Sequence, residues 1–244
     1  RMCLSVMSAM QSRVLARRLT HTTLAVMISS TRVVSEERPL STVGSDESEL
    51  AAVLDADGVL KAISSSLAFP VVVKPARSGS AQGVTIVRKA EQLSRAMIDA
   101  YVYCDVAIIE KYVEGTELAI SVIDLGAGPI ALPAVEIEAL DGNFGYQERY
   151  TPGETNYYVP ARLTKAVAER AAKVAIQAHE SLGMRHLSRI DLIIDKKGTP
   201  WFLEANVCPG MTETSLLPQA VVAAGHSLGE VYYSLAEAAL RGRG

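Results

Sequence analysis

Apolar positions along the chain recur with two periods, which predict a mixture of strands and helices. Helix spacing is present in "KAEQLSRAMIDAYVYC" (89–104), "TKAVAERAAKVAIQAHESLG" (164–183), "LLPQAVVAAG" (216–225) and "SLGEVYYSLAEAAL" (227–240). Short apolar or alternating runs predict strands at 22–34, 69–75, 84–87, 106–113, 116–125, 129–137, 185–195 and 199–207. Turn residues separate many consecutive strands, so the pattern predicts an α/β (α+β) protein with many hairpins rather than a doubly wound parallel sheet.

The N-terminal part and one later loop lack this clear pattern. Val14, Leu15 and Leu19 have the spacing of an amphipathic helix that leads into the following strand. An organelle transit peptide is the alternative, because residues 1–35 contain five arginines and no acidic residue. "SDESELAAVLDA" (45–56) predicts a capped helix. The polar and aromatic segment 141–162 has the length of a functional loop. We therefore divide the chain into a divergent part, 1–66, and two subdomains, 67–140 and 141–244.

Composition and charge narrow the classes of function. The chain has 244 residues, 49% hydrophobic and 21% charged, which is typical of a globular protein. A net charge of −3 gives no electrostatic case for nucleic acid or an anionic membrane as a partner. Cys3, Cys104 and Cys208 are too few and too scattered for a disulfide framework, which favours a cytoplasmic protein.

The strongest chemical pattern lies in the last two predicted strands. A hairpin turn at 197–198 pairs Asp191 with Glu204 and Arg189 with Asn206, and alternation then places these side chains on one face. Their apolar neighbours are expected on the opposite face: Ile190, Leu192, Leu203 and Ala205. Carboxylate and amide oxygens are hard ligands for Mg²⁺, and a guanidinium binds phosphate in a bidentate manner. The alternative is a solvated hairpin face with cross-strand charge pairs.

Two further stretches are suited to a nucleotide. Lys74 ends a strand and precedes a Gly/Ser loop, 77–83, whose backbone N–H groups are able to approach phosphate oxygens. The strand 108–118 offers backbone groups to an adenine edge and places Glu117 for ribose hydroxyls. A plain turn is the alternative for the loop, and exposed edge-strand charges are the alternative for the strand.

Five stretches, in this order, resemble the D-alanine–D-alanine ligases of the ATP-grasp superfamily. They are "FPVVVKPARSGSAQGV", "IIEKYVEGTEL", "YQERYTPGETNYYVPA", "SRIDLIID" and "FLEANVCPGMTETSLLP". The resemblance implies an ATP-grasp fold, in which two subdomains with antiparallel sheets enclose the nucleotide. It also implies ADP-forming ligation of two D-alanines through an acylphosphate, for peptidoglycan and hence cell-wall synthesis.

The resemblance assigns roles to individual residues. It implies that two Mg²⁺ (or Mn²⁺) ions are held by Asp191, Glu204 and Asn206. ATP is expected to contact Lys74, Glu110, Lys111, Val113, Glu117 and Arg149. The expected catalytic residues are Arg189 and the backbone N–H of Gly210 at the oxyanion, with Ser80 and Tyr150 as a hydrogen-bonded pair. The carboxylate of the second D-alanine is expected at Ser215 and Leu216.

The family's N-terminal domain, which helps to hold the first D-alanine, has no match in this sequence. Three alternatives therefore stay open: a D-alanine–D-lactate or D-alanine–D-serine ligase, another ATP-grasp carboxylate–amine ligase, or a truncated, non-catalytic nucleotide-binding module. The expected partners are ATP and D-alanine. A homodimer also stays open, because the family's dimers form through the unmatched domain.

Overall fold

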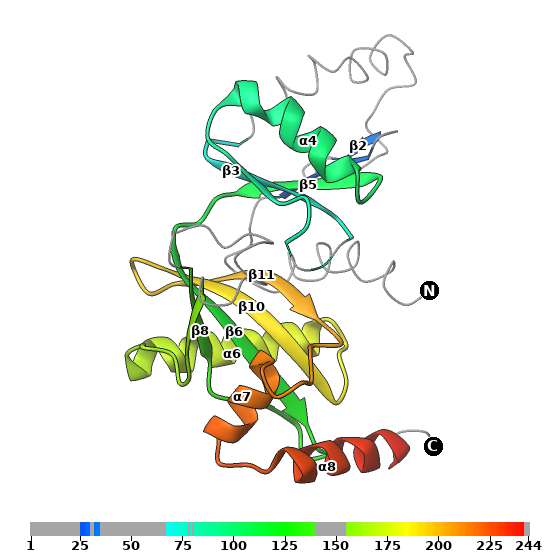
Figure 1. Ribbon diagram of the computed structural model, residues 1–244, viewed down its shortest axis with the longest axis vertical. Helices are drawn as coiled ribbons and strands as arrows, with labels where there is room; N and C mark the ends of the chain where they lie inside the picture. Colours follow the sequence, from blue (N-terminus) through cyan, green and yellow to red (C-terminus); the bar gives the residue numbers. More distant parts are fainter. Residues whose placement is uncertain are drawn as a thin grey trace. The chain divides into compact units, whose positions relative to one another are not determined.

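The computed structural model describes residues 67–77, 79, 81–139 and 155–241, and only the backbone of 25–29 and 32–34. The helices expected near the N-terminus and at 45–56, and most of the loop 141–162, lie outside these residues. The described chain forms two compact units, the first ending at Tyr112 and the second beginning at Val113. Figure 1 shows the elements of each. No helix in the described part is long and apolar enough to cross a membrane.

The first unit is an antiparallel sheet with one helix packed against it. Its strands, in the spatial order β2-β1-β5-β3-β4, are β1 (Ala25–Ser29), β2 (Arg32–Val34), β3 (Val71–Pro75), β4 (Thr85–Val87) and β5 (Val106–Lys111). The helix α4 (Leu93–Tyr101) follows a 3-10 turn at Ala90–Gln92. Val71 and Val73 are buried with Leu93, Ala96 and Ala100 of α4, because alternate residues of β3 point to one face of the sheet.

The sequence predicts a single strand over 22–34, whereas the structure has two. β1 and β2 pair in antiparallel fashion, with Met27 opposite Val34 and Ser29 opposite Arg32. The two strands flank a polar pair in the sequence, Ser30-Thr31, which interrupts the apolar run. β1 also pairs with β5, so this segment is an integral part of the sheet.

The second unit is a larger antiparallel sheet covered by helices. Its strands are β6 (Gly115–Asp124), β7 (Pro129–Ala131), β8 (Val135–Ala139), β9 (Thr155–Tyr158), β10 (Leu187–Asp195) and β11 (Pro200–Asn206). They lie in the order β11-β10-β6-β8-β9, and β7 also pairs with β6. The helices are α6 (Lys165–Ser181), α7 (Leu216–Ala223) and α8 (Leu228–Arg241).

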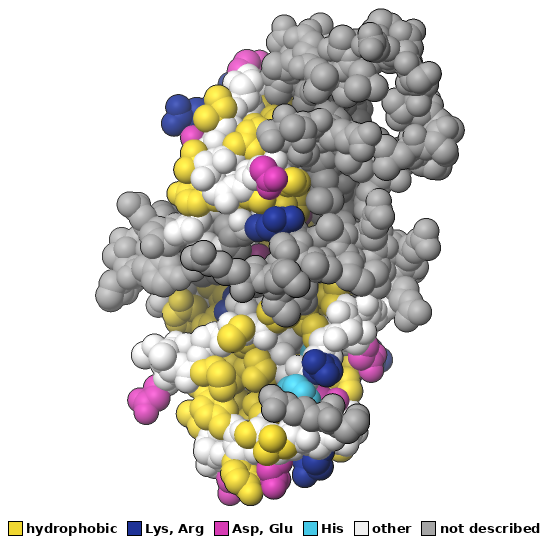
Figure 2. Space-filling view, turned by 90° about the vertical axis from the view of Figure 1, so that its right-hand side faces the viewer, with side chains coloured by type: hydrophobic (Ala, Val, Ile, Leu, Met, Phe, Trp, Pro, Cys, Tyr) yellow, Lys and Arg dark blue, Asp and Glu magenta, His cyan; other side chains and the backbone are white. Residues whose placement is uncertain are grey.

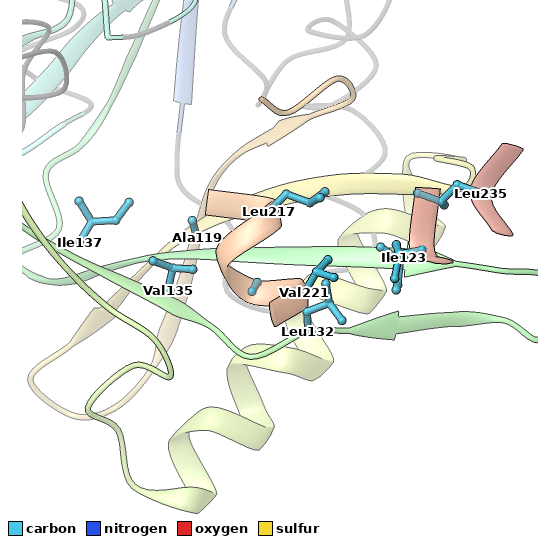
Figure 3. Close-up of a cluster of buried hydrophobic side chains, with 10 residues drawn as sticks. Ala119, Ile123, Leu132, Val135, Ile137, Leu217, Val221 and Leu235 are labelled. Carbon is cyan, nitrogen blue, oxygen red and sulfur yellow. The ribbon is translucent and has the colours of Figure 1, made fainter. Parts of the chain in front are cut away.

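Alternation along β6 gives the second unit two separate cores. Leu118, Ile120 and Val122 pack with the alanines of α6. Ala119 and Ile123, on the other face, pack with residues of α7 and α8; Figure 3 shows Leu217 and Val221 of α7 in this cluster. α6 therefore covers one face of the sheet, and α7 and α8 cover the other.

Hydrophobic side chains also gather on the face of the second unit drawn in Figure 2. The exposed large hydrophobic residues of this unit are Ile130, Tyr157, Met211, Val222, Tyr233 and Leu240. Single exposed apolar residues are normal on a protein surface.

Candidate active site

The hairpin of β10 and β11 brings the predicted polar residues together. Arg189 lies opposite Asn206, and Asp191 lies opposite Glu204, which confirms the predicted register at these positions. Directly opposed residues of an antiparallel pair project from the same face, and so do residues two apart on one strand. The four side chains therefore share one face of the sheet.

The register changes by one residue just beyond these pairs. Leu192 lies opposite Phe202, so Leu203 is the extra residue of a β-bulge. Phe202 and Ala205 pack against the core cluster beneath α6. The prediction did not include this bulge. An unbroken ladder would place Leu203 opposite Leu192, whereas the structure has Phe202 there.

Asp195 fixes the turn that joins the two strands. Its Oδ1 accepts hydrogen bonds from the backbone N–H groups of Lys197 (2.9 Å) and Thr199 (2.8 Å). Its Oδ2 accepts one from Trp201 Nε1 (3.0 Å). The bond from Trp201, followed by that from Thr199, lowers the pKa of Asp195. These bonds stabilise one conformation of the turn, and the turn sets the register in which the two strands pair.

β6 extends the polar face of the hairpin. Asp191 lies opposite Ala119, so the odd-numbered residues of β6 share the face of the site. Glu117 is two residues from Ala119 and belongs to this face. The polar group thus lies on the side of the sheet that α7 and α8 cover, beside their apolar core.

Arg189 and Asp191 form an ion pair within this face. Arg189 Nε donates to Asp191 Oδ1 and Arg189 Nη2 donates to Asp191 Oδ2, both at 2.8 Å. The Arg189 side chain is 14% exposed and that of Asp191 is 4% exposed. Burial acts to lower the pKa of Arg189, but the charge and hydrogen bonds of Asp191, with the charges of Glu204 and Glu117, outweigh it and raise that pKa. Arg189 is therefore a permanent cation among three carboxylates.

The oxygen-bearing side chains of this face suit a hard divalent cation. Asp191 is buried, Glu204 is exposed and Asn206 is half-buried. Asn206 Oδ1 accepts a hydrogen bond from the backbone N–H of Cys208 (3.0 Å), and an amide oxygen has a second lone pair. No three His, Cys, Asp or Glu side chains in the described ranges lie close enough to hold a metal ion. The Asn206 oxygen adds a third ligand of a kind that Mg²⁺ accepts beside the carboxylates of Asp191 and Glu204.

In the first unit, Lys74 forms an ion pair with Glu110. Lys74 lies opposite Ile108, and Glu110 lies opposite Val72, so the two are diagonal neighbours on one face. Lys74 Nζ is 2.8 Å from Glu110 Oε1, and both side chains are largely buried. β5 lies between β1 and β3, so Glu110 is not an edge-strand charge, and that alternative is wrong for this residue.

The other residues of the predicted adenine-binding stretch follow β5. Lys111 is the exposed last residue of that strand. Val113 is half-buried at the start of the second unit. Next to it, Glu114 forms an exposed ion pair with Lys196 (2.9 Å).

Comparison with protein families identifies the chain. The model described as the C-terminus of D-ala D-ala ligase matches residues 48–237. This chain belongs to the D-alanine–D-alanine ligase family. The predicted resemblance is thereby confirmed.

Relatives in this family match about three quarters of the chain. The D-alanine–D-alanine ligase of Bordetella petrii is 38% identical over 183 residues, which are 75% of this chain and 56% of that protein. The D-alanine–D-alanine ligase of Anaeromyxobacter sp. is 42% identical over 173 residues, 71% of this chain and 54% of that protein. The chain thus spans a little over half the length of these relatives.

Solved structures of similar proteins establish the fold. The VanG D-Ala:D-Ser ligase of Enterococcus faecalis has a TM-score of 0.74 at 24% identity, covering 96% of this chain and 62% of that one. The D-alanine–D-alanine ligase of Bacillus anthracis complexed with ATP has a TM-score of 0.70 at 23% identity, covering 98% and 67%. The fold is therefore the α/β ATP-grasp fold with antiparallel sheets, as predicted.

In this member of the D-alanine–D-alanine ligase family, the turn after β11 is held from several sides. Thr212 Oγ1 lies 2.7 Å from Ser215 Oγ, and Ser215 is the N-cap residue of α7. Tyr232 of α8 donates a hydrogen bond to the carbonyl oxygen of Met211 (3.2 Å). A Cβ atom on Gly210 would lie 2.6 Å from Ser215 Oγ, so a larger residue here would displace the Ser215 hydroxyl. Leu216 is the half-buried first residue of α7.

Three predicted site residues lie outside the described part of the chain: Ser80, Arg149 and Tyr150. Their roles in a D-alanine–D-alanine ligase stay predictions.

Sequence reasoning missed the contacts that hold the site residues in place. It did not find the side-chain partner of Lys74, although the pairing of strands 69–75 and 106–113 would have suggested a facing carboxylate. It also missed Thr212, whose only signal is the spacing of hydroxyls in "TETS".

Proposed function

We propose that this chain is the ATP- and metal-binding part of an ADP-forming D-alanine–D-alanine ligase. The single observation that supports this most strongly is the placement of Arg189, Asp191, Glu204 and Asn206 on one face of a sheet, in a chain of this family. A buried arginine among carboxylates suits phosphoryl transfer. The guanidinium is able to bind an anionic substrate, and the carboxylates beside it are able to bind the metal ions that accompany a triphosphate. The enzyme acts on small molecules in the cytoplasm, in synthesis of the peptidoglycan precursor.

Asp191, Glu204 and Asn206 are the residues that would hold two Mg²⁺ (or Mn²⁺) ions. Bound there, the ions would neutralise negative charge on the triphosphate. The donor set of two carboxylates and one amide fits such ions better than it fits softer metals, which prefer sulfur or imidazole. The nucleotide itself is assigned to Lys74, Glu110, Lys111, Val113, Glu117 and Arg149.

The proposed reaction has two steps. The carboxylate of one D-alanine takes the γ-phosphoryl group of ATP, and ADP leaves. The amine of a second D-alanine then attacks the acyl carbon, inorganic phosphate leaves and a peptide bond forms. Arg189 and the backbone N–H of Gly210 stabilise the oxygen on which negative charge develops, because fixed donors in a dry site act strongly on such charge.

The remaining assignments concern the second substrate and the loop. Ser215 and Leu216 bind the carboxylate of the second D-alanine. The resemblance to the family assigns Ser80 and Tyr150 to a hydrogen-bonded pair, and a tyrosine at this position of the family pattern favours an amine over a hydroxy acid as the acceptor. The D-serine and D-lactate ligases are therefore the alternatives within the family, and the likeness to a D-Ala:D-Ser ligase keeps the first of them in view.

Phosphate release tests the reaction and separates these alternatives. The full chain is incubated with Mg²⁺, ATP and D-alanine alone, or with D-alanine plus D-serine or D-lactate, and the dipeptide or depsipeptide is identified by mass spectrometry. We expect phosphate release that depends on D-alanine and yields D-alanyl-D-alanine. Binding of Mg·ATP without any D-alanine-dependent release would instead support the non-catalytic nucleotide-binding module.

A substitution of Glu204 tests the metal assignment. We expect Glu204→Gln to reduce Mg²⁺-dependent turnover at least about a hundredfold while the fold stays intact, because the change removes a charged ligand but little volume. Glu213→Gln is the matched control, since Glu213 is exposed in the turn that follows β11 and is not assigned to the metal. Equal turnover in the two variants would contradict the role of Glu204.

A further inference from the structure

Each carboxylate oxygen of Asp191 accepts a hydrogen bond within the protein and keeps a further lone pair, so competition with a cation comes from the charge of the donor. The two bonds, each of 2.8 Å, come from Nε and Nη2 of Arg189. This fork geometry is the strongest arrangement between a guanidinium and a carboxylate. The pair is also largely shielded from water, since its side chains are 14% and 4% exposed.

Asp191 and Arg189 have different partners in the proposed reaction. This inference rests on that proposed function. Asp191 has to offer an oxygen to a divalent cation, and Arg189 has to offer its donors to an anionic substrate. A cation bound to Asp191 and a guanidinium bound to the same two oxygens repel each other strongly at such short range in a buried site. The observed pair and the metal-bound carboxylate therefore compete.

We propose that Arg189 and a divalent cation exchange at the carboxylate of Asp191. Arg189 holds Asp191 in its buried position until a divalent cation binds, and then releases at least one oxygen. The donors Nε and Nη2 that it withdraws become available to the acyl oxygen or to a phosphoryl group. Arg189 is thereby presented to the substrate only when the metal ligands are in use.

The charges around the pair favour such an exchange over expulsion of the arginine. Glu117, which is not assigned to the metal, also stabilises the charged form of Arg189, so the guanidinium retains an anionic neighbour when it leaves Asp191. Thermodynamic linkage makes this coupling reciprocal. If the bound metal raises the affinity for an anionic substrate at Arg189 by a certain factor, the bound substrate raises the metal affinity of Asp191 by the same factor.

Binding of Mn²⁺ alone, without nucleotide, tests the exchange in the full chain. Arg189→Lys retains the positive charge but loses the two parallel bonds, because an ammonium is a single point donor. We expect it to bind Mn²⁺ about tenfold more tightly than the unchanged chain, the order of one charged hydrogen bond. If Arg189 acts only through its charge, the two affinities will be equal, and that result would overturn the proposal.

Arg162→Lys is the matched control for this titration. Arg162 Nε and Nη2 bond Glu136 Oε1 at 3.1 and 2.5 Å, and Nη2 bonds Glu138 at 2.8 Å. Glu136 lies opposite Leu118, so this cluster belongs to the face of the sheet that α6 covers. We expect Arg162→Lys to leave the Mn²⁺ affinity unchanged; a similar gain in both variants would count against a specific role of Arg189.

A spectroscopic measurement keeps the test valid if the substituted chain does not fold. In the unchanged chain labelled with ¹⁵N-arginine, we expect the Nε–H of Arg189 to be protected from exchange by its bond to Asp191. We expect Mg²⁺ to shift this signal and to speed its exchange with water, while the Nε–H signal of Arg162 stays in place. Saturation with Mg²⁺ that leaves the Arg189 signal unmoved would refute the exchange.

Failure of this inference is distinguishable from failure of the proposed function. Mg²⁺-dependent binding of ATP together with equal Mn²⁺ affinities would contradict only the exchange. Absence of both metal and ATP binding would contradict the proposed function and the exchange together.

Discussion

His179 is a titratable residue that the fold buries away from the candidate site. It is 2% exposed in α6, and its Nδ1 lies 2.8 Å from the buried Ser188 Oγ of β10. Burial lowers the pKa of His179, although the charges of Asp124 and Glu180 oppose the shift. The residue is therefore part of a polar contact between helix and sheet, and its burial there favours the neutral imidazole.

This contact should make the stability of the chain depend on pH. The unfolded chain takes up a proton on His179 near its ordinary pKa of about 6.5, before the folded chain does. The contribution of neutral His179 to the free energy of unfolding is therefore fully present above that pH. It decreases as the pH drops towards the lower folded pKa, by up to about 1.4 kcal/mol per pH unit. Urea unfolding of the unchanged chain and of His179→Gln between pH 7.5 and 5.5 measures the difference.

His226 provides the control for this experiment, because it is exposed in the connection between α7 and α8. His226→Gln should retain the pH dependence of the unchanged chain, and His179→Gln should lose part of it. The same pH dependence in all three proteins would show that His179 does not contribute.

The residues of the candidate site were more predictable than their contacts. The period of two along a strand and the arithmetic of a hairpin are enough to put Asp191 opposite Glu204 and Arg189 opposite Asn206. The pairing of Arg189 with Asp191 on the same strand was not predictable, because it depends on side-chain rotamers. Lys74 and Glu110 meet only because β3 and β5 are neighbours, which short local patterns do not specify.

At the scale of elements, one glycine allows two strands to come together. Gly115 begins β6 and pairs with Asp195 at the end of β10. A Cβ atom at this position would lie 2.1 Å from the backbone oxygen of Ile194. This clash involves a backbone atom, so rotation of a side chain cannot relieve it. The approach of these two strands supports the strand pair that carries Asp191 and Glu117.

Gly115→Ala should therefore destabilise the second unit by roughly 1–3 kcal/mol, the range for overpacking in a close contact. Gly229→Ala in α8 is the matched control: its nearest neighbour would be 3.8 Å away, and alanine favours a helix by up to about 1 kcal/mol over glycine. The free energy of unfolding in urea measures both. A Gly115→Ala chain as stable as the Gly229→Ala chain would contradict the close approach.

Elements with strong periodicity were predictable, and interruptions were not. The helix predicted over 164–183 is α6, because its alanines recur on one face and its ends carry Thr164 and Gly183. The bulge at Leu203 was missed, since nothing in "WFLEAN" marks an extra residue. The single strand expected at 22–34 was wrong because a pairing between β1 and β2 overrides a nearly continuous apolar run.

At the scale of the whole molecule, the chain contains two antiparallel sheets that each carry part of the predicted chemistry. Lys74 and Glu110 belong to the first unit, and Arg189, Asp191, Glu204 and Asn206 belong to the second. The family match extends across both units. The hydrophobic pattern alone predicted an α/β protein with many hairpins, and the resemblance of five ordered stretches to the ligase family implied the ATP-grasp fold.

The central claim is that this chain binds ATP through Mg²⁺ held on the face formed by β10 and β11. Isothermal titration of the full chain with ATP, in Mg²⁺ and then in EDTA, tests it most directly. We predict binding in Mg²⁺ that weakens at least about tenfold without the metal, because two carboxylates facing a triphosphate repel it unless a cation intervenes. ATP binding that is equally tight in EDTA, or no binding under either condition, would contradict the account.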